Sequence, residues 1–271
     1  MKHWTAIVCF LTLLMSFSAR AAGDYLILGV QDYVRSPILV VRDYEAMRDY
    51  LAKVTKKKVR VEAVRTYDEY MKQAQQKRYA FMYAPPSMIM KANKLAGYEP
   101  VVKVPGLLSA TFFALAKSEI AFPEDMKGKR IGFYEKDSMI TQLALANLRS
   151  QGIDPEKYFK SITYYADSNG VISALQYNLI DVAAANSTLF TNWTNKGYDL
   201  NVIMQTKGMP HLTFAVRADL PESLKQTVTN ALLKAENEKD MQTYFRLSGF
   251  QSFEPAKLSD YDELVKILNI Q

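Results

Sequence analysis

The amino-acid sequence predicts an α/β protein of two lobes, in which each lobe has a mostly parallel sheet flanked by helices. Two observations lead to this fold class. Strands and helices alternate with short links in two separate passages, and two long β-prone segments connect the passages. The chain has 271 residues, of which 49% are hydrophobic and 23% charged, so it can bury a substantial core in one or two domains.

The first passage, between residues 24 and 86, reads as strand, helix, strand, helix, strand. "DYLILGV" and "KVRVEAV" are short apolar runs typical of strands, and "YAFMYAPP" is a third strand that the two prolines stop. Apolar residues at helical spacing predict a helix over residues 37–54, and Thr66 opens a second helix in "TYDEYMKQAQQ". Strands that are joined through helices in this way pair in parallel.

The second passage repeats this order with similar spacing. "KRIGFY", "KSITYYA" and "IDVAAAN" read as strands, with helices over residues 138–150 and in "NGVISALQYNL" between them. Asp137, Ser138 and Thr141 surround the start of the first of these helices. The free N–H groups of a helix start can hold an anion, or the side chains there can simply cap the helix.

"GLLSATFFALAKS" and "HLTFAVRADL" are the extended segments that connect the two passages. Two strands that cross between lobes form a hinge, and the cleft between the lobes is then the default ligand site. Helices in "LPESLKQTVTNALLKAEN" and over residues 261–268 are expected to complete the first lobe. We therefore expect lobe 1 to comprise residues 22–114 and 213–271, and lobe 2 to comprise residues 115–212.

The first 21 residues differ from the rest of the chain. Lys2 precedes a mostly apolar stretch over residues 6–17, and Ala19-Arg20-Ala21 fits a small-x-small cleavage site. This pattern predicts a signal peptide that is cut after Ala21, and hence a periplasmic protein. The alternative is a membrane anchor, but the stretch is shorter than the roughly 20 residues needed to span a bilayer.

Composition excludes several classes of site. Beyond residue 21 the chain has no cysteine and a single histidine, His211, which excludes disulfides and thiol chemistry and leaves little for a Ser-His-Asp triad. The lysines and arginines are scattered apart from residues 56–58, unlike a nucleic-acid footprint. We therefore expect no catalytic, metal or cofactor site and no nucleic-acid partner, with carboxylate-only chemistry as the remaining enzymatic alternative.

Four stretches together carry a resemblance to a known family: "TYDEYMKQAQQKRYAFMYAPPS", "FPEDMKGKRIGFYEKDS", "GVISALQYNLIDVAAAN" and "LPESLKQTVTNALLKA". In this order and spacing they resemble the periplasmic substrate-binding proteins of phosphate/phosphite/phosphonate ABC transporters. The resemblance implies a type II periplasmic binding fold, in which two lobes joined by two crossing strands close over a small oxyanion.

The resemblance also implies ligand residues, although the family's motif is degenerate in this chain. The family's ligand tyrosine after the second strand corresponds to Tyr67. Its Ser-Thr-Ser at the start of the second-lobe helix aligns with Ser138, Met139 and Ile140, so only the first hydroxyl is kept, and Thr141 adds one a step later.

Three other family positions have also changed. Ser168 stands where the family has a histidine, and Thr188 stands where some members have an acidic residue that holds a ligand amine. The tyrosine of the crossing strand is replaced by Ser109 or Ala110. These changes argue against an aminoalkylphosphonate and favour an anion held by hydroxyls and backbone N–H groups, beside a more apolar surface.

Further candidates come from position alone. Arg35 follows the first strand, where ligands approach parallel sheets, and is the one side chain here that would add positive charge. Tyr83 ends the third strand and His211 precedes the return strand, so both are candidates to line the cleft. Core packing is the alternative for the tyrosine, and a structural role is the alternative for the histidine.

The combined hypothesis is a periplasmic solute-binding protein, expected to be a monomer. It binds a small ligand, such as phosphate, phosphite or a phosphonate, for a membrane permease of an ABC transporter. The alternative keeps the fold and makes the protein a ligand sensor or accessory protein that docks on a membrane receptor or kinase.

Overall fold

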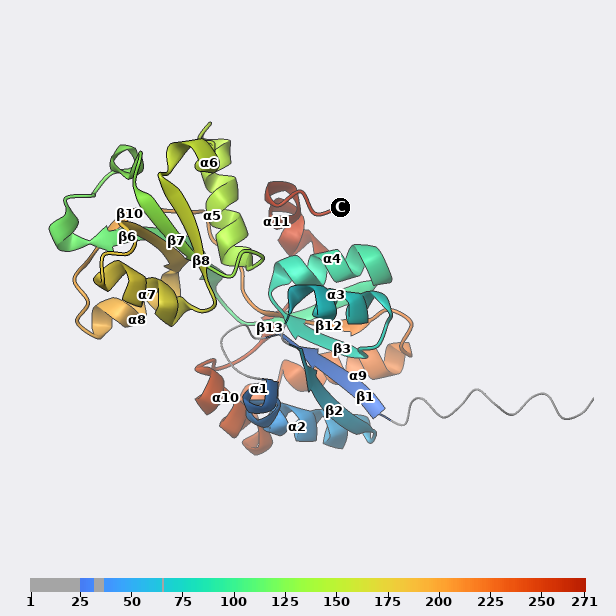
Figure 1. Ribbon diagram of the computed structural model, residues 1–271. Helices are drawn as coiled ribbons and strands as arrows, with labels where there is room; N and C mark the ends of the chain where they lie inside the picture. Colours follow the sequence, from blue (N-terminus) through green and yellow to red (C-terminus); the bar gives the residue numbers. More distant parts are fainter. Residues whose placement is uncertain (1–24, 32–36, 65) are drawn as a thin grey trace, which may run out of the picture.

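Two sheets and a short hinge ribbon organise residues 25–31, 37–64 and 66–271, which the computed structural model describes. The sheets belong to two α/β lobes, so the predicted two-lobe α/β class is confirmed (Figure 1). The expectation of mostly parallel sheets is wrong: both sheets are mixed, because β6 (Ala110–Leu115) and β12 (Thr213–Arg217) run antiparallel to their neighbours. Within these ranges no helix is long and apolar enough to cross a membrane. The predicted signal peptide lies outside the described residues.

Lobe 1 is built on a six-stranded sheet in the order β13-β4-β12-β3-β1-β2. The first strand pairs in parallel with its neighbours β2 and β3, as strand–helix alternation predicts, whereas β12 pairs antiparallel with β3 and β4. The strands are β1 (Tyr25–Val30), β2 (Lys58–Ala63), β3 (Phe81–Ala84), β4 (Tyr98–Lys103), β12 (Thr213–Arg217) and β13 (Glu254–Pro255).

Helices cover both faces of this sheet (Figure 1). One face carries α1 (Pro37–Asp43), α2 (Glu45–Thr55), α9 (Glu222–Leu232) and α10 (Gln242–Ser248). The other face carries α3 (Tyr67–Gln75), α4 (Pro86–Ala96) and α11 (Asp262–Ile267). The helix predicted over residues 37–54 is therefore two helices, because the chain turns at Tyr44.

Lobe 2 is built on a five-stranded sheet in the order β10-β6-β9-β7-β8. Strand β7 pairs in parallel with β8 and with the central strand β9, and β6 pairs antiparallel with β9 and β10. The strands are β6 (Ala110–Leu115), β7 (Arg130–Tyr134), β8 (Ser161–Tyr165), β9 (Val182–Asn186) and β10 (Leu200–Gln205). The helices are α5 (Met139–Ser150), α6 (Pro155–Tyr158), α7 (Ser168–Gln176) and α8 (Ser187–Asn195).

An ion pair fixes the entrances of β7 and β9. The guanidinium of Arg130 donates to both carboxylate oxygens of Asp181, at 3.0 and 2.6 Å, and the backbone N–H of Arg130 donates to the same carboxylate at 2.8 Å. These bonds hold the two parallel strands in register, so that both strands end at the same edge of the sheet.

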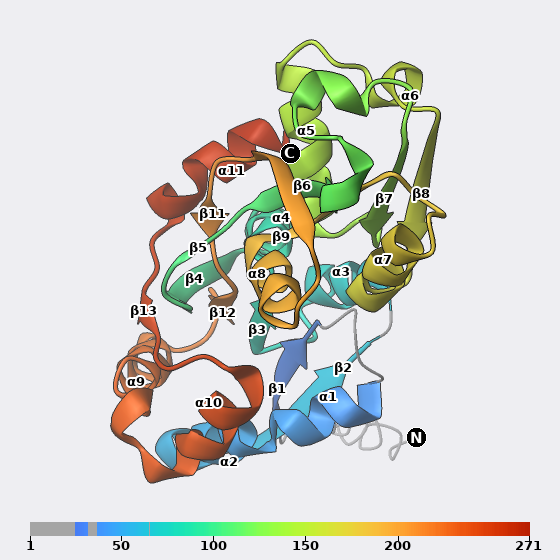
Figure 2. The ribbon, with the colours of Figure 1, turned by 90° about the vertical axis from the view of Figure 1, so that its left-hand side faces the viewer.

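The hinge is a two-stranded ribbon, β5 (Leu107–Leu108) paired antiparallel with β11 (Met209–Pro210) (Figure 2). The expected lobe boundary at residue 114 is therefore corrected: β6 already belongs to the sheet of lobe 2, and the crossing lies before it. The first extended segment was read as one crossing strand, but its second half finds its pairing partners inside lobe 2.

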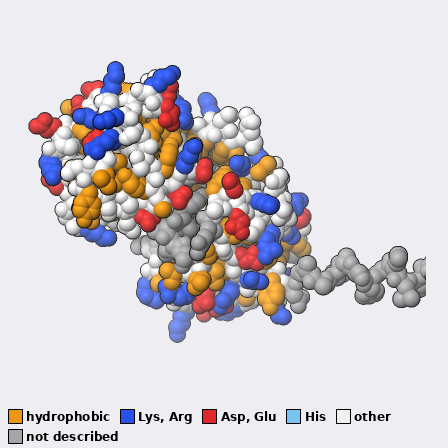
Figure 3. All heavy atoms as spheres, viewed as in Figure 1, with side chains coloured by type: hydrophobic (Ala, Val, Ile, Leu, Met, Phe, Trp, Pro, Cys, Tyr) orange, Lys and Arg blue, Asp and Glu red, His pale blue; other side chains and the backbone are white. Residues whose placement is uncertain are grey.

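Short 3-10 helices complete the chain. They are η1 (Ala116–Ser118), η2 (Pro123–Met126), η3 (Ala235–Asn237), η4 (Lys239–Met241) and η5 (Leu258–Tyr261). On the face seen in Figure 3, positive and negative side chains are interspersed over both lobes. This mixed surface agrees with the scattered lysines and arginines of the sequence.

Candidate functional site

A cavity of about 320 Å³ lies between the lobes beside the hinge. Lobe 2 contributes the end of β7, the start of α5, the end of β9 and the start of α8, while lobe 1 and the hinge contribute the opposite wall. The lining residues are Pro85, Leu108, Tyr134, Ser138, Met139, Ile140, Asn186, Thr188, Leu189, His211, Leu212, Ser248 and Phe250. A ligand bound here would touch both lobes.

Two helix N-termini meet at this cavity. β7 and β9 are adjacent and parallel, so the helices that follow them, α5 and α8, both begin at the same edge. Ser138 caps α5 and Asn186 caps α8, and both caps line the cavity. The first turns of these helices carry N–H groups without an intrahelical acceptor, together with the positive end of each macrodipole. Such a place favours an anion.

The hydroxyls at the start of α5 are used inside the protein. The Ser138 hydroxyl accepts from the N–H of Thr141 at 3.2 Å, and the Thr141 hydroxyl donates to the carbonyl oxygen of Tyr134 at 2.6 Å. The two hydroxyls lie 3.0 Å apart, and both residues are buried. What remains for a ligand is the N–H groups of Met139 and Ile140, which have no carbonyl one turn earlier in the helix.

Neutral donors surround the remaining space. Asn186 uses its carbonyl oxygen to accept from the N–H of Leu189 at 2.7 Å, which leaves its NH₂ group to donate. Burial raises the pKa of Tyr134 to about 12, against weaker lowering by hydrogen bonds from Asn186 and Ser138. Its phenol therefore keeps its proton over the whole physiological range.

His211 is also neutral. Its Nδ1 accepts from the N–H of Leu212 at 2.7 Å, so the ring hydrogen is assigned to Nε2. Burial lowers the pKa of His211 to about 4 from its ordinary 6.5. The ring meets Phe250 edge to face, with centroids 5.1 Å apart. Nε2–H is thus an uncharged donor in the wall of lobe 1.

The rest of the lining is apolar. Six hydrophobic side chains from both lobes and the hinge form this surface: Leu108, Met139, Ile140, Leu189, Leu212 and Phe250. Among the described residues that line the cavity, none is Asp, Glu, Lys or Arg. The site therefore combines backbone and neutral side-chain donors with an apolar surface that an organic group can contact.

The structure brings together four of the predicted ligand residues, Ser138, Met139, Thr188 and His211. Tyr67 lies apart from them, in a neighbouring cavity of about 470 Å³, where the Lys91 ammonium sits 5.2 Å from the centre of its ring. The two cavities are neighbours, since the consecutive residues Asp137 and Ser138 each line one of them.

Three predicted ligand residues are buried inside the lobes instead. Tyr83 is 1% exposed in the aromatic core of lobe 1, and its hydroxyl accepts from that of Tyr244 at 2.9 Å, so the cleft assignment is wrong. Thr141 and Ser168 are 1% and 4% exposed, and neither is among the residues that line the inter-lobe cavity. Arg35 lies outside the described residues.

Sequence reasoning missed several lining residues, chiefly Tyr134, Asn186, Leu108, Ser248 and Phe250. A signal existed for the first two, because they end parallel strands, and ligands bind outside the carboxyl ends of such strands. The hinge leucine, Ser248 at the end of α10 and Phe250 just after this helix carry no such local signal.

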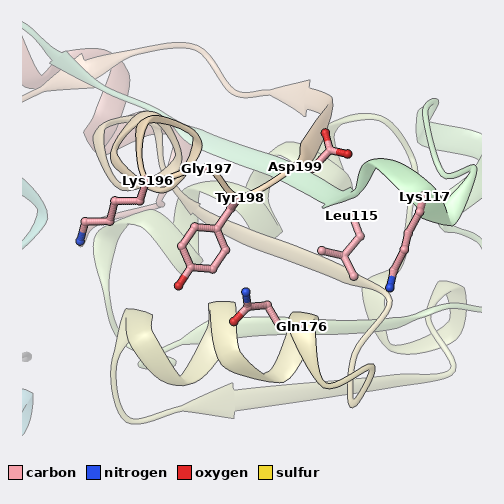
Figure 4. A pocket seen from close by; sticks show the side chains of 7 residues that line it. All are labelled: Leu115, Lys117, Gln176, Lys196, Gly197, Tyr198 and Asp199. Atoms are coloured by element: carbon pink, nitrogen blue, oxygen red, sulfur yellow. The ribbon is translucent and has the colours of Figure 1, made fainter.

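A larger cavity, of about 530 Å³, lies entirely within lobe 2 (Figure 4). Leu115 and Lys117 come from the end of β6 and the turn after it, Gln176 from α7, and residues 196–199 from the connection after α8. Gln176 and Tyr198 point toward one another across it (Figure 4). Because only one lobe lines it, a ligand there would not be coupled to lobe closure.

Comparisons with known proteins agree with this architecture. Residues 34–261 match the model of a family described as ABC transporter, phosphonate, periplasmic substrate-binding protein. A search of curated proteins found no match.

Solved structures share the fold at low sequence identity. PhnD1 of Prochlorococcus marinus (MIT 9301), in complex with methylphosphonate, is 14% identical with a TM-score of 0.79, over 92% of this chain and 99% of that one. A binding protein component of an ABC phosphonate transporter from Pseudomonas aeruginosa is 17% identical with a TM-score of 0.73, over 90% and 85%. The periplasmic aliphatic sulphonate binding protein SsuA of Escherichia coli is 14% identical with a TM-score of 0.62, over 92% of each chain. The extent of the family match shows that this chain belongs to the periplasmic substrate-binding proteins of phosphonate ABC transporters.

Proposed function

We propose that the chain binds a small oxyanion of the phosphonate type in the 320 Å³ inter-lobe cavity and presents it to the membrane permease of an ABC transporter. The observation that carries the proposal is the meeting of two helix N-termini, those of α5 and α8, at a cavity lined by both lobes. The role is binding and delivery without catalysis, by a monomer exported through a signal peptide that ends at Ala21.

The ligand is proposed to be held by dipoles and hydrogen bonds. The first-turn N–H groups of α5 and α8, the Asn186 amide and the Tyr134 hydroxyl donate from lobe 2, and Nε2–H of His211 donates from the opposite wall. A ligand held from both sides favours the closed arrangement of the lobes by its extra contacts, and the permease is proposed to recognise that arrangement.

The test is the thermal stability of residues 22–271 with methylphosphonate, phosphite and phosphate in turn. A ligand at 100 times its Kd stabilises the folded form by about 2.7 kcal/mol, which raises the melting temperature measurably. A rise with at least one of these anions is expected. No rise with any of them would contradict the proposal.

Thr188 offers a matched pair of variants for the same experiment. It is exposed, lines the cavity and lies in the first turn of α8, where an acidic side chain suits the helix. Thr188→Glu should abolish the ligand-induced rise by repelling the anion, without lowering the melting temperature of the free protein. Thr188→Gln, similar in size and uncharged, should keep most of the rise.

A further inference from the structure

The charge available in the inter-lobe cavity sets a limit on the charge of its ligand. No described residue of its lining is Asp, Glu, Lys or Arg. The charged residues within three positions of a lining residue along the chain lie outside the lining: Glu135, Lys136, Asp137 and Arg246. All of these except Glu135 are exposed, so water screens them.

The two helix N-termini supply the positive field instead. A helix macrodipole is equivalent to about half an elementary charge at its N-terminus, so α5 and α8 together present about one positive charge. These helices have 12 and 9 residues, enough for the effect to develop at both. One negative charge on the ligand would be balanced by these helix starts. A second would meet no charged partner among the described lining residues, and burying such a charge is costly.

The size and surface of the cavity point to an organic substituent on the anion. Its volume of about 320 Å³ corresponds to roughly ten water molecules at about 30 Å³ each, and methylphosphonate, with the bulk of roughly three waters, fills about a third of that space. The remaining surface is formed by hydrophobic side chains, among them Met139, Ile140 and Phe250. An alkyl group gains by leaving water for such a surface.

We propose that the cavity selects singly charged organic oxyanions, either phosphonates in their monoanionic form or alkanesulfonates, over doubly charged anions and inorganic phosphate. This inference rests on the proposed function, because it names the ligand class of the same cavity. Its basis is that two helix N-termini together balance about one negative charge on the ligand. The organic group of the ligand then lies against the apolar part of the lining.

The described lining residues do not titrate near neutral pH. An experiment can therefore change the charge of the ligand through pH without changing the charge of this lining. His211 and Tyr134 are the titratable residues in the described lining, and their pKa values of about 4 and about 12 lie far from neutrality. A change of affinity between about pH 6 and about pH 8.5 then reports mainly the ionisation of the ligand.

The experiment measures affinity calorimetrically at these two pH values for four ligands. Ethanesulfonate and monomethyl methylphosphonate stay monoanionic, whereas methylphosphonate and phosphate gain a second charge as the pH rises. We expect constant affinity for the first two and about tenfold weaker binding of methylphosphonate at the higher pH, with phosphate weakest throughout. Methylphosphonate that binds more tightly as a dianion overturns the inference. If the phosphonate monoester binds and ethanesulfonate does not, the preference for one negative charge still holds, and the ligand class is restricted to phosphorus oxyanions.

A variant reverses the expected preference. Thr188→Lys adds one positive charge to the lining, so methylphosphonate should then bind more tightly at the higher pH, by about tenfold. Thr188→Gln changes the same side chain without adding a charge, so it should not reverse the pH preference, whatever it does to the affinity itself. A Thr188→Lys protein that still disfavours the dianion contradicts the charge argument. Failure of all four ligands and of phosphite with the original chain would refute the proposed function itself, which is a different outcome.

Discussion

The half-buried imidazole of His211 should make the stability of the protein depend on pH in a defined window. The fold lowers the pKa of His211 to about 4, against 6.5 in the unfolded chain. The unfolded chain therefore takes up a proton more readily below pH 6.5, and stability is lost as the pH falls from there toward 4, with no effect above it. Between about pH 7.5 and about pH 5 the expected loss from this one residue is about 2 kcal/mol.

His211→Asn isolates this contribution. Asparagine can still accept from the N–H of Leu212 but does not titrate, so the pH dependence of its free energy of unfolding lacks the His211 part. Urea denaturation gives the free energy of unfolding of both proteins at the two pH values. The contributions of carboxylates, which are common to both proteins, cancel when their pH dependences are subtracted. Residues 22–271 contain no other histidine, so the proton NMR signal of the ring also reports the pKa directly. A ring that titrates near 6.5, or two proteins with the same pH dependence, would refute the argument.

Three other substitutions test the structure at separate points. Thr141→Val removes the hydroxyl that donates to Tyr134 O, and should lower stability in urea by about 1–2 kcal/mol while calorimetry shows unchanged affinity for any anion. Asp181→Asn removes the charge that Arg130 binds in a partly exposed pair, and should lower the urea midpoint by the equivalent of about 1 kcal/mol. Phe250→Ala should weaken binding of a propyl-substituted anion more than that of its methyl analogue, by about tenfold, because only the longer chain loses apolar contact; equal losses would remove this ring from the ligand wall.

The alternation of strands and helices could be read from the sequence because it is a local pattern, but the breaks within it could not. Apolar periodicity continues through Tyr44, where the chain nevertheless turns from α1 to α2. Pro85-Pro86 predicts the end of a strand, but Pro86 also starts α4, since proline suits the first helical position. The pairing of β6 with β9 and β10 was not visible because the partner of a strand is a non-local property.

The start of α5 shows why a correct position does not establish a correct role. Ser138 was placed at the cleft, and it does line the cavity, yet its hydroxyl and that of Thr141 are engaged at the end of β7. A hydroxyl has a single proton, so one that is donated to the carbonyl of Tyr134 is not available to a ligand. The sequence shows that hydroxyls are present, but their direction depends on which acceptor the folded chain leaves free beside them.

The same geometry changes the meaning of Met139 and Ile140. Their side chains carry no hydrogen-bond donor. Compared with the family's Ser-Thr-Ser, they would be expected to weaken oxyanion binding at this helix. The backbone N–H groups that remain free at the start of α5, however, belong to these two residues and do not depend on side-chain identity. Met and Ile in place of the family's Thr and Ser therefore leave the backbone donors in place and make their surroundings apolar. This change affects which substituent the bound anion can carry more than it affects whether an anion can bind.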